Sequence, residues 1–195
     1  MDIIWAFLST HAIEIIGFVL GVCYLYYEYQ ASNWVWLFSL LMPMVSMYVY
    51  FSAGLYADFS INIYYLVASL YGLIIWRGTK RKKAAVISHI GTHVALISII
   101  TMLTIWLCIY LILVTFTDST VPVMDALTTA ISIVGTWMLA KKYIEQWFAW
   151  MIVDAINIGL YIYKDIPFYA TLYAIYTIVA YFGYRNWKKK MLSQT

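Results

Sequence analysis

Seven long apolar segments dominate the sequence and constrain the fold more than any other feature. They cover residues 12–29, 33–51, 58–76, 94–116, 121–140, 145–163 and 167–187. Each is close to the roughly 20 residues that an α-helix needs to cross the hydrocarbon core of a bilayer. In hydrocarbon the backbone must satisfy its own hydrogen bonds, and segments of this length do so as helices. We therefore expect an all-α integral membrane protein with seven transmembrane helices.

The composition supports the same fold class. Of 195 residues, 65% are hydrophobic and only 11% are charged, whereas soluble domains carry about a quarter charged residues. Too few polar residues remain to cover a globular surface in water. Connections as short as QASN and KKYIE predict that the helices they join are antiparallel neighbours.

The basic residues predict an orientation. With seven spans, 11 of the 12 lysines and arginines lie on one side: Arg77, Lys80, Arg81, Lys82, Lys83, Lys141, Lys142, Arg185, Lys188, Lys189 and Lys190. Lys164 alone lies on the other side. Because basic residues are enriched in cytoplasmic loops, we expect a multi-pass protein of the plasma membrane with its N-terminus outside and its C-terminus in the cytoplasm. The charge therefore needs no nucleic-acid partner to explain it.

The two halves of the sequence resemble each other weakly. Asn33-Trp34 matches Gln146-Trp147 at a spacing of 113 residues, and YGLIIW at 71–76 matches FGYRNW at 182–187 after a two-residue slip. We expect a single transmembrane domain over 1–195 in a 3+1+3 arrangement, with parallel repeats at 12–76 and 121–187 and a linking helix at 94–116. Transporters use such repeats and place the substrate near the midplane where the repeats meet.

The sixth segment carries the strongest candidate site. Helical spacing of three or four residues puts five side chains on one face: Trp147, Trp150, Asp154, Asn157 and Tyr161. A carboxylate near the bilayer centre costs a few kcal/mol and persists when it faces a cavity, a partner or a ligand. Aromatic faces beside it can hold a flat ring or a cation. The alternative is a polar clamp between helices, with Trp147 and Tyr161 anchored at the membrane interface.

Two further residues are secondary candidates, and several motifs are missing. Thr136 could bind a substrate hydroxyl, and Asn33 could serve the first repeat, whereas Thr128 and Thr129 are expected to bond their own helix. His89 and His93 have a metal-like spacing without a third ligand nearby. There is no phosphate-binding GxxxxGK[ST] loop, no catalytic metal set and no lysine in the last segment that could bind retinal. We therefore expect no enzyme activity, no cofactor and no metal.

Segments five to seven contain four distinctive motifs: DALTTA, the W-x-x-W-x-x-x-D run, LYIYK at the helix end and the final FGYRNWKK. With these motifs the segments resemble the second half of the PnuC family of vitamin-precursor transporters. It implies a 3+1+3 fold related to the SWEET sugar transporters, a homotrimer in the bacterial inner membrane, and uptake of nicotinamide riboside by facilitated diffusion. A cytoplasmic kinase would trap the substrate by phosphorylation. The W-x-x-W pair and Asp154 are the site residues matched to the family.

The residues leave the substrate open among B-vitamin precursors. Nicotinamide riboside contains a flat pyridinium cation with ribose hydroxyls, and thiamine is also a flat cation with a hydroxyl. Riboside carriers of this family have Gln near the position of Gly135-Thr136-Trp137 and Tyr at the position of Asn157, so the pocket differs there. Thiamine or another B-vitamin precursor is therefore the alternative substrate. A membrane receptor or scaffold that binds a ligand without moving it is the alternative class.

Overall fold

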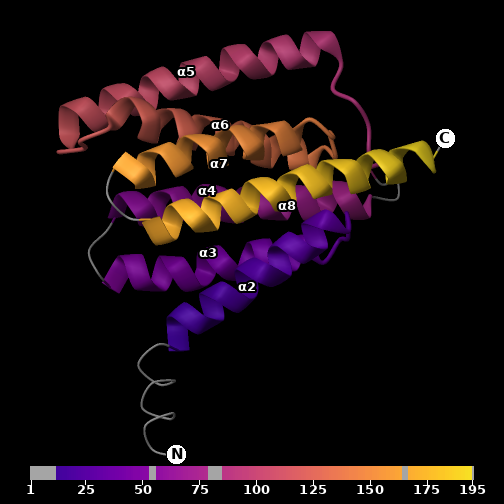
Figure 1. Ribbon diagram of the computed structural model, residues 1–195, viewed down its shortest axis with the longest axis horizontal. Coiled ribbons are helices and arrows are strands. Elements are labelled where there is room, and N and C mark those ends of the chain that lie inside the picture. The colour runs from indigo at the N-terminus through magenta and orange to yellow at the C-terminus, as the bar shows by residue number, and fades with distance from the viewer. Residues whose placement is uncertain (1–11, 53–55, 79–84, 164–166, 195) are drawn as a thin grey trace, which may run out of the picture. The chain divides into compact units, whose positions relative to one another are not determined.

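The computed structural model describes residues 12–52, 56–78, 85–163 and 167–194. Its helices are α2 (Ala12–Tyr29), α3 (Val35–Ser52), α4 (Tyr56–Arg77), α5 (Thr92–Phe116), α6 (Pro122–Ala140), α7 (Gln146–Tyr163) and α8 (Pro167–Leu192) (Figure 1). In the described residues the only other regular pairing is an isolated bridge between Ser88 and Tyr143. The predicted helices are thus confirmed, and α8 extends to Leu192, beyond the predicted 187. The basic run 80–83 and Lys164 lie outside the described residues.

The chain divides into two compact units, residues 1–84 and 85–195. The first contains α2, α3 and α4, and the second contains α5 to α8. Within each unit, helices that follow one another pack together: α2 on α3, α3 on α4, α5 on α6, α6 on α7 and α7 on α8. The short connections at 30–34 and 141–145 therefore join neighbouring helices, as predicted. The linking helix α5 belongs to the second unit.

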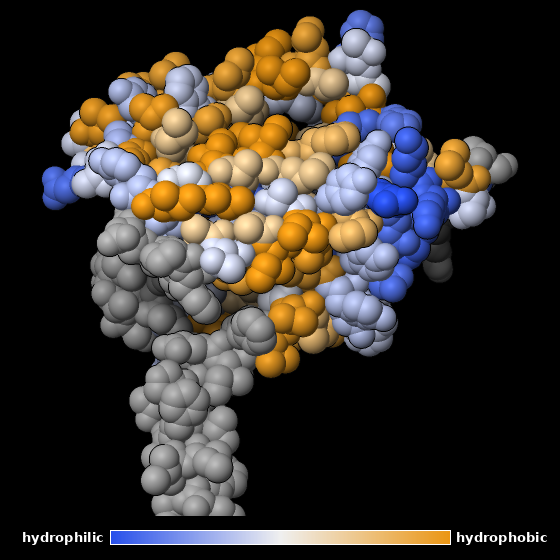
Figure 2. Space-filling model, in the orientation of Figure 1, coloured by the Kyte–Doolittle hydropathy of each residue, from blue (hydrophilic) through white to orange (hydrophobic). Residues whose placement is uncertain are grey.

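Apolar side chains cover much of the face that Figure 2 shows, and hydrophilic side chains gather at one end of it. By length and composition, α5 and α6 could each cross a membrane, and shorter apolar stretches lie at Val35–Tyr48 and Ile61–Arg77. No residue of α5 is buried, although its sequence is almost entirely apolar. Burial in a soluble core therefore cannot explain this helix, and its surface requires lipid or a protein partner.

The turns after α2 and α6 have the same geometry. Ala31 (φ 50°) and Lys142 (φ 56°) both adopt the left-handed conformation just past a helix end. The same two backbone hydrogen bonds close each turn. After α2, Ser32 N–H donates to Tyr27 C=O (3.0 Å) and Ala31 N–H donates to Glu28 C=O (2.9 Å). After α6, Tyr143 N–H donates to Met138 C=O (3.0 Å) and Lys142 N–H donates to Leu139 C=O (2.9 Å). This is the Schellman motif, which satisfies carbonyls at a helix C-terminus.

A buried tryptophan of α3 packs directly against a glycine of α4 in the first unit. Trp36 is fully buried, and its ring lies so close to Gly72 that a Cβ placed there would come within 2.2 Å of it. The ring of Trp76 meets that of Trp36 edge-on, with centroids 5.4 Å apart and an interplanar angle of 87°. Only glycine permits this approach, so Gly72 is a packing requirement.

The second unit contains the same cluster between α7 and α8. A Cβ on Gly183 would lie 2.4 Å from the ring of Trp147, which meets Trp187 edge-on at 5.7 Å and 87°. We refer to each set of tryptophan, glycine and tryptophan as a tryptophan lock. Residues 36, 72 and 76 correspond to 147, 183 and 187 at a constant spacing of 111, and so do the two left-handed residues.

This spacing corrects one detail of the expected pairing of the halves. The sequence comparison aligned Trp34 with Trp147 at a spacing of 113, but Trp36 occupies the place of Trp147. Trp34 is 58% exposed and contributes to no lock. Two nearby tryptophans gave the sequence two possible registers, and only the packing against glycine distinguishes them.

Candidate functional site

The candidate site is built on one face of α7. The helix begins at Gln146 and ends at Tyr163 without proline or charge in its first turn. Helical geometry places its polar and aromatic side chains at 147, 150, 154, 157 and 161 on a common face. Trp147 and Asp154 are buried, and Trp150, Asn157 and Tyr161 are partly exposed.

Trp147 belongs to the packing of α7 on α8. Its ring is 1% exposed and fills the space above Gly183. Its Nε1 has no hydrogen-bond partner within the described residues, but the same is true of Trp36 in the first unit. The unpaired indole N–H is therefore a property of the tryptophan lock. Packing accounts for Trp147 without a ligand.

Asp154 is the buried charge of the site. Its side chain is 7% exposed, and within the described residues its carboxylate has neither a hydrogen bond nor an ion pair. Tyr173 and Tyr176 of α8 lie within electrostatic range of it. A buried carboxylate that lies near two tyrosines and has no basic partner in the described part of the chain is suited to a cationic ligand.

Trp150 lies one helical turn before Asp154 and faces α6. Gly135 of α6 approaches α7 closely: a Cβ on it would lie 3.3 Å from Ala149 and 3.8 Å from the Trp150 ring. The Trp150 Nε1 is buried without a partner in the described part of the chain. The counterpart of Trp150 at the 111-residue spacing is Ser39, so this indole has no equivalent in the first unit.

Tyrosines of α8 extend the site beyond the predicted residues. Tyr161 stacks on Tyr173 at 5.4 Å and 12°, and Tyr173 meets Tyr176 edge-on at 5.8 Å and 81°. Sequence reasoning missed Tyr173 and Tyr176. Their spacing of three residues would place both rings on one face of a helix, but with 19 tyrosines in the chain such pairs are common and indicate little.

Of the two secondary candidates, Thr136 lies on α6, next to the glycine that approaches Trp150, and Asn33 lies in the first unit. Thr136 is 8% exposed, and its hydroxyl donates to the Ser132 carbonyl at 2.8 Å, which leaves only its acceptor lone pairs for a ligand. Thr128 and Thr129 bond carbonyls of their own helix, as expected. Asn33 belongs to the first unit, where it lines a recess of about 320 Å³. Trp34, Leu37, Leu40, Leu73 and Arg77 also line this recess.

Gln146 is a further residue of the α7 face that sequence reasoning passed over. It is fully buried, and neither its Nε2 nor its Oε1 has a hydrogen-bond partner in the described residues. The available signal was its position, because residue 146 lies one turn before 150 and two turns before 153 and 154 on the same face. Position alone does not reveal its burial, because a glutamine next to the basic turn could equally be exposed to solvent.

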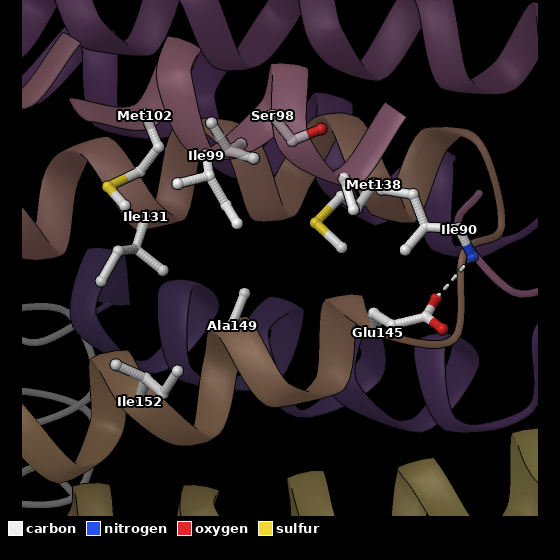
Figure 3. Close-up of a pocket in the computed structure, with 11 residues that line it drawn as sticks. Ile90, Ser98, Ile99, Met102, Ile131, Met138, Glu145, Ala149 and Ile152 are labelled. Carbon is white, nitrogen blue, oxygen red and sulfur yellow. Dashed lines mark hydrogen bonds between the residues drawn. The ribbon is translucent and has the colours of Figure 1, made fainter. Parts of the chain in front are cut away.

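A separate apolar cavity of about 320 Å³ lies on the other side of α7, between α5 and α6. Figure 3 shows Ala149 and Ile152 of α7 pointing into it, with Met102 and Met138 across from them. The carboxylate of Glu145 at its edge is already occupied, because it accepts from His89 Nδ1 (2.7 Å) and from the Ile90 N–H (3.0 Å). This cavity offers little to a polar cation.

The described residues form no group of three or more histidine, cysteine, aspartate or glutamate side chains that could hold a metal. His89, one half of the metal-like pair, instead contacts Glu145. The candidate site therefore combines the carboxylate of Asp154, amide side chains on the same helix and a set of aromatic rings.

Comparisons with known proteins identify the family of this chain. Residues 11–189 match the family model described as nicotinamide mononucleotide transporter. A Neisseria mucosa protein named nicotinamide riboside transporter PnuC is 24% identical over 173 residues, which are 82% of this chain and 65% of that protein, slightly under two thirds of its length. The Haemophilus influenzae protein of the same name is 20% identical over 192 residues, covering 95% of this chain and 84% of that one.

A third relative is named for a different substrate. The riboflavin/roseoflavin transporter RibM of Streptomyces davaonensis is 26% identical over 183 residues, covering 89% of this chain and 83% of that protein. Among solved structures, the crystal structure of the vitamin B3 transporter PnuC superposes with a TM-score of 0.74 at 20% identity, over 100% of this chain and 88% of that chain. That likeness shows the fold. Because the family model matches nearly the whole sequence, this chain belongs to the nicotinamide mononucleotide transporter family.

Proposed function

We propose that this protein carries a flat, cationic B-vitamin precursor across the bacterial inner membrane, with nicotinamide riboside as the first candidate. Two relatives named as nicotinamide riboside transporters support the substrate, and the family supports transport over catalysis. The observation that carries the proposal is the Asp154 carboxylate, which is buried near Tyr173 and Tyr176 and has no basic partner among the residues that the structure describes.

The chemistry of the α7 face suits a pyridinium nucleoside. Asp154 can offset the positive charge of the ring, and the face of Trp150, four residues away on α7, can supply a cation–π contact worth roughly 0.5–2 kcal/mol. Asn157 and the free lone pairs of Thr136 can bond ribose hydroxyls. In this proposal Trp147 holds α7 against α8 and Asn33 takes no direct part.

The proposed mode of transport rests on two features: the sequence has no ATP-binding loop, and the two halves repeat the same turn and tryptophan lock. Without an ATP-binding loop of its own, the chain would work by facilitated diffusion, with a cytoplasmic kinase trapping the arriving substrate. The identical turns and tryptophan locks at a spacing of 111 support two parallel three-helix repeats joined by α5. Rocking of one repeat against the other would expose the site alternately. The outward N-terminus, the cytoplasmic C-terminus and a homotrimer belong to the same proposal.

The first test is counterflow of labelled nicotinamide riboside in proteoliposomes, with Asp154→Asn beside the wild type. Asparagine keeps the shape and removes the charge, so the variant should fold and yet require at least about tenfold more substrate, since charged hydrogen bonds contribute about 1.5–3 kcal/mol. Asp125→Asn is the matched control, because Asp125 bonds Ser119 near the start of α6, away from the α7 face. Equal transport by both variants would assign Asp154 to helix packing.

The same assay separates the alternatives. Counterflow of riboflavin or thiamine in place of the riboside would support transport and change the assigned substrate. Riboflavin is included because the RibM relative is named as a riboflavin transporter. Saturable binding without counterflow of any of the three would indicate a receptor or scaffold.

A further inference from the structure

Gln146 is a buried polar side chain that the fold itself does not need. It is fully buried and its amide makes no hydrogen bond in the described residues, an arrangement that destabilises the folded chain. In the first unit the corresponding residue is Val35, which is equally buried at the same place in the same turn. An apolar side chain therefore satisfies the packing at this position.

The position of Gln146 relates it to the candidate site. Gln146, Trp150 and Asp154 follow one another at intervals of four residues on one face of α7. With a rise of 1.5 Å per residue, successive members lie about 6 Å apart along the axis. A ligand along this face would meet an amide, an indole and a carboxylate in that order.

We infer that Gln146 binds the donor–acceptor edge of the substrate's ring and selects a carboxamide over a carboxylate. This inference rests on the proposed function and names the part of the substrate that α7 recognises first. A glutamine amide offers an acceptor oxygen beside an NH₂ donor, which can form two parallel hydrogen bonds with another primary amide. A carboxylate offers acceptors alone and leaves the Oε1 of Gln146 facing an oxygen. Sites that bury polar groups reject ligands that leave those groups unpaired.

The test compares nicotinamide riboside with nicotinic acid riboside, which differ in this one group. Dissociation constants would be measured by quenching of tryptophan fluorescence in detergent, together with the thermal midpoint of the ligand-free protein. Gln146→Val should weaken nicotinamide riboside binding at least tenfold and abolish the preference between the two ligands. Its thermal midpoint should be unchanged or higher, because an unsatisfied buried amide has been removed.

Val35→Gln is the matched control, since it places the same amide at the corresponding position of the first unit. It should lower the thermal midpoint and leave the ligand preference as in the wild type. Retention of the wild-type preference by Gln146→Val, or a lower midpoint without a change in preference, would overturn the inference and make Gln146 a structural residue. A wild type that binds neither riboside would instead exclude nicotinamide riboside as the substrate, and overturn the inference with it.

Discussion

The tryptophan lock of the second unit predicts a large effect of a single methyl group. In Gly183→Ala the new Cβ would lie 2.4 Å from one atom of the Trp147 ring and 2.6 Å from two more. Ordinary carbon contacts are about 3.5–4.0 Å, so the ring would have to retreat by roughly 1 Å or more. It is 1% exposed and is held edge-on by Trp187, which leaves no free space beside it.

The magnitude follows from two opposing terms. Overpacking a well-filled core costs about 1–3 kcal/mol, and a rigid, enclosed ring favours the upper end of this range. Alanine in place of glycine regains about 1 kcal/mol of helix propensity in α8. We therefore expect the free energy of unfolding to fall by about 2 kcal/mol. Gly72→Ala should act in the same direction, since its Cβ would lie 2.2 Å from Trp36.

Unfolding by SDS in mixed micelles, followed by circular dichroism, would measure this loss. Gly159→Ala is the control: it lies in α7 with nothing within 4 Å of the added Cβ, so it should gain stability from helix propensity alone. Combining Gly183→Ala with Trp147→Leu should cost less than the sum of the single changes, because both act on one contact. If Gly183→Ala proved as stable as Gly159→Ala, the lock would not constrain the packing of α7 on α8.

Two further changes test other parts of the fold. Ala31→Gly should raise the free energy of unfolding by about 0.5–1 kcal/mol in the same SDS titration, because glycine adopts the left-handed conformation that alanine holds at φ 50°; no gain would mean that the turn is unstrained. Glu145→Gln should speed hydrogen exchange at the Ile90 amide about tenfold, because the carboxylate accepts bonds from both His89 and Ile90; unchanged exchange would show that other contacts hold this segment.

The helices were predictable from sequence because several independent features of each segment indicate the same helix. Each apolar segment has the length of a span and ends at polar or basic residues, so their number and order followed directly. The internal register was not predictable, because Trp34 and Trp36 compete for the same pairing and only the approach to Gly72 decides between them. Sequence carries no direct record of such close contacts.

The site was predictable in part for a related reason. Asp154 stood out because a charge in an apolar helix is rare. Trp147 shared its face but serves packing, which helical periodicity cannot distinguish from binding. Gln146 was obscured because a glutamine beside a basic turn appears solvated until its burial is known. Tyr173 and Tyr176 required the pairing of α7 with α8, which is a tertiary property.

The separate tryptophan locks also bear on how the protein is made. In the first unit every component, from Trp36 to Trp76, belongs to residues that leave the ribosome before α5 begins. Domains generally fold as units during synthesis, the N-terminal one first. The first three helices can thus complete their tightest contact while the second unit is still being translated. The long apolar α5 would then enter the bilayer after the first three helices have assembled, which reduces the number of unpaired helices exposed to wrong partners at any one time.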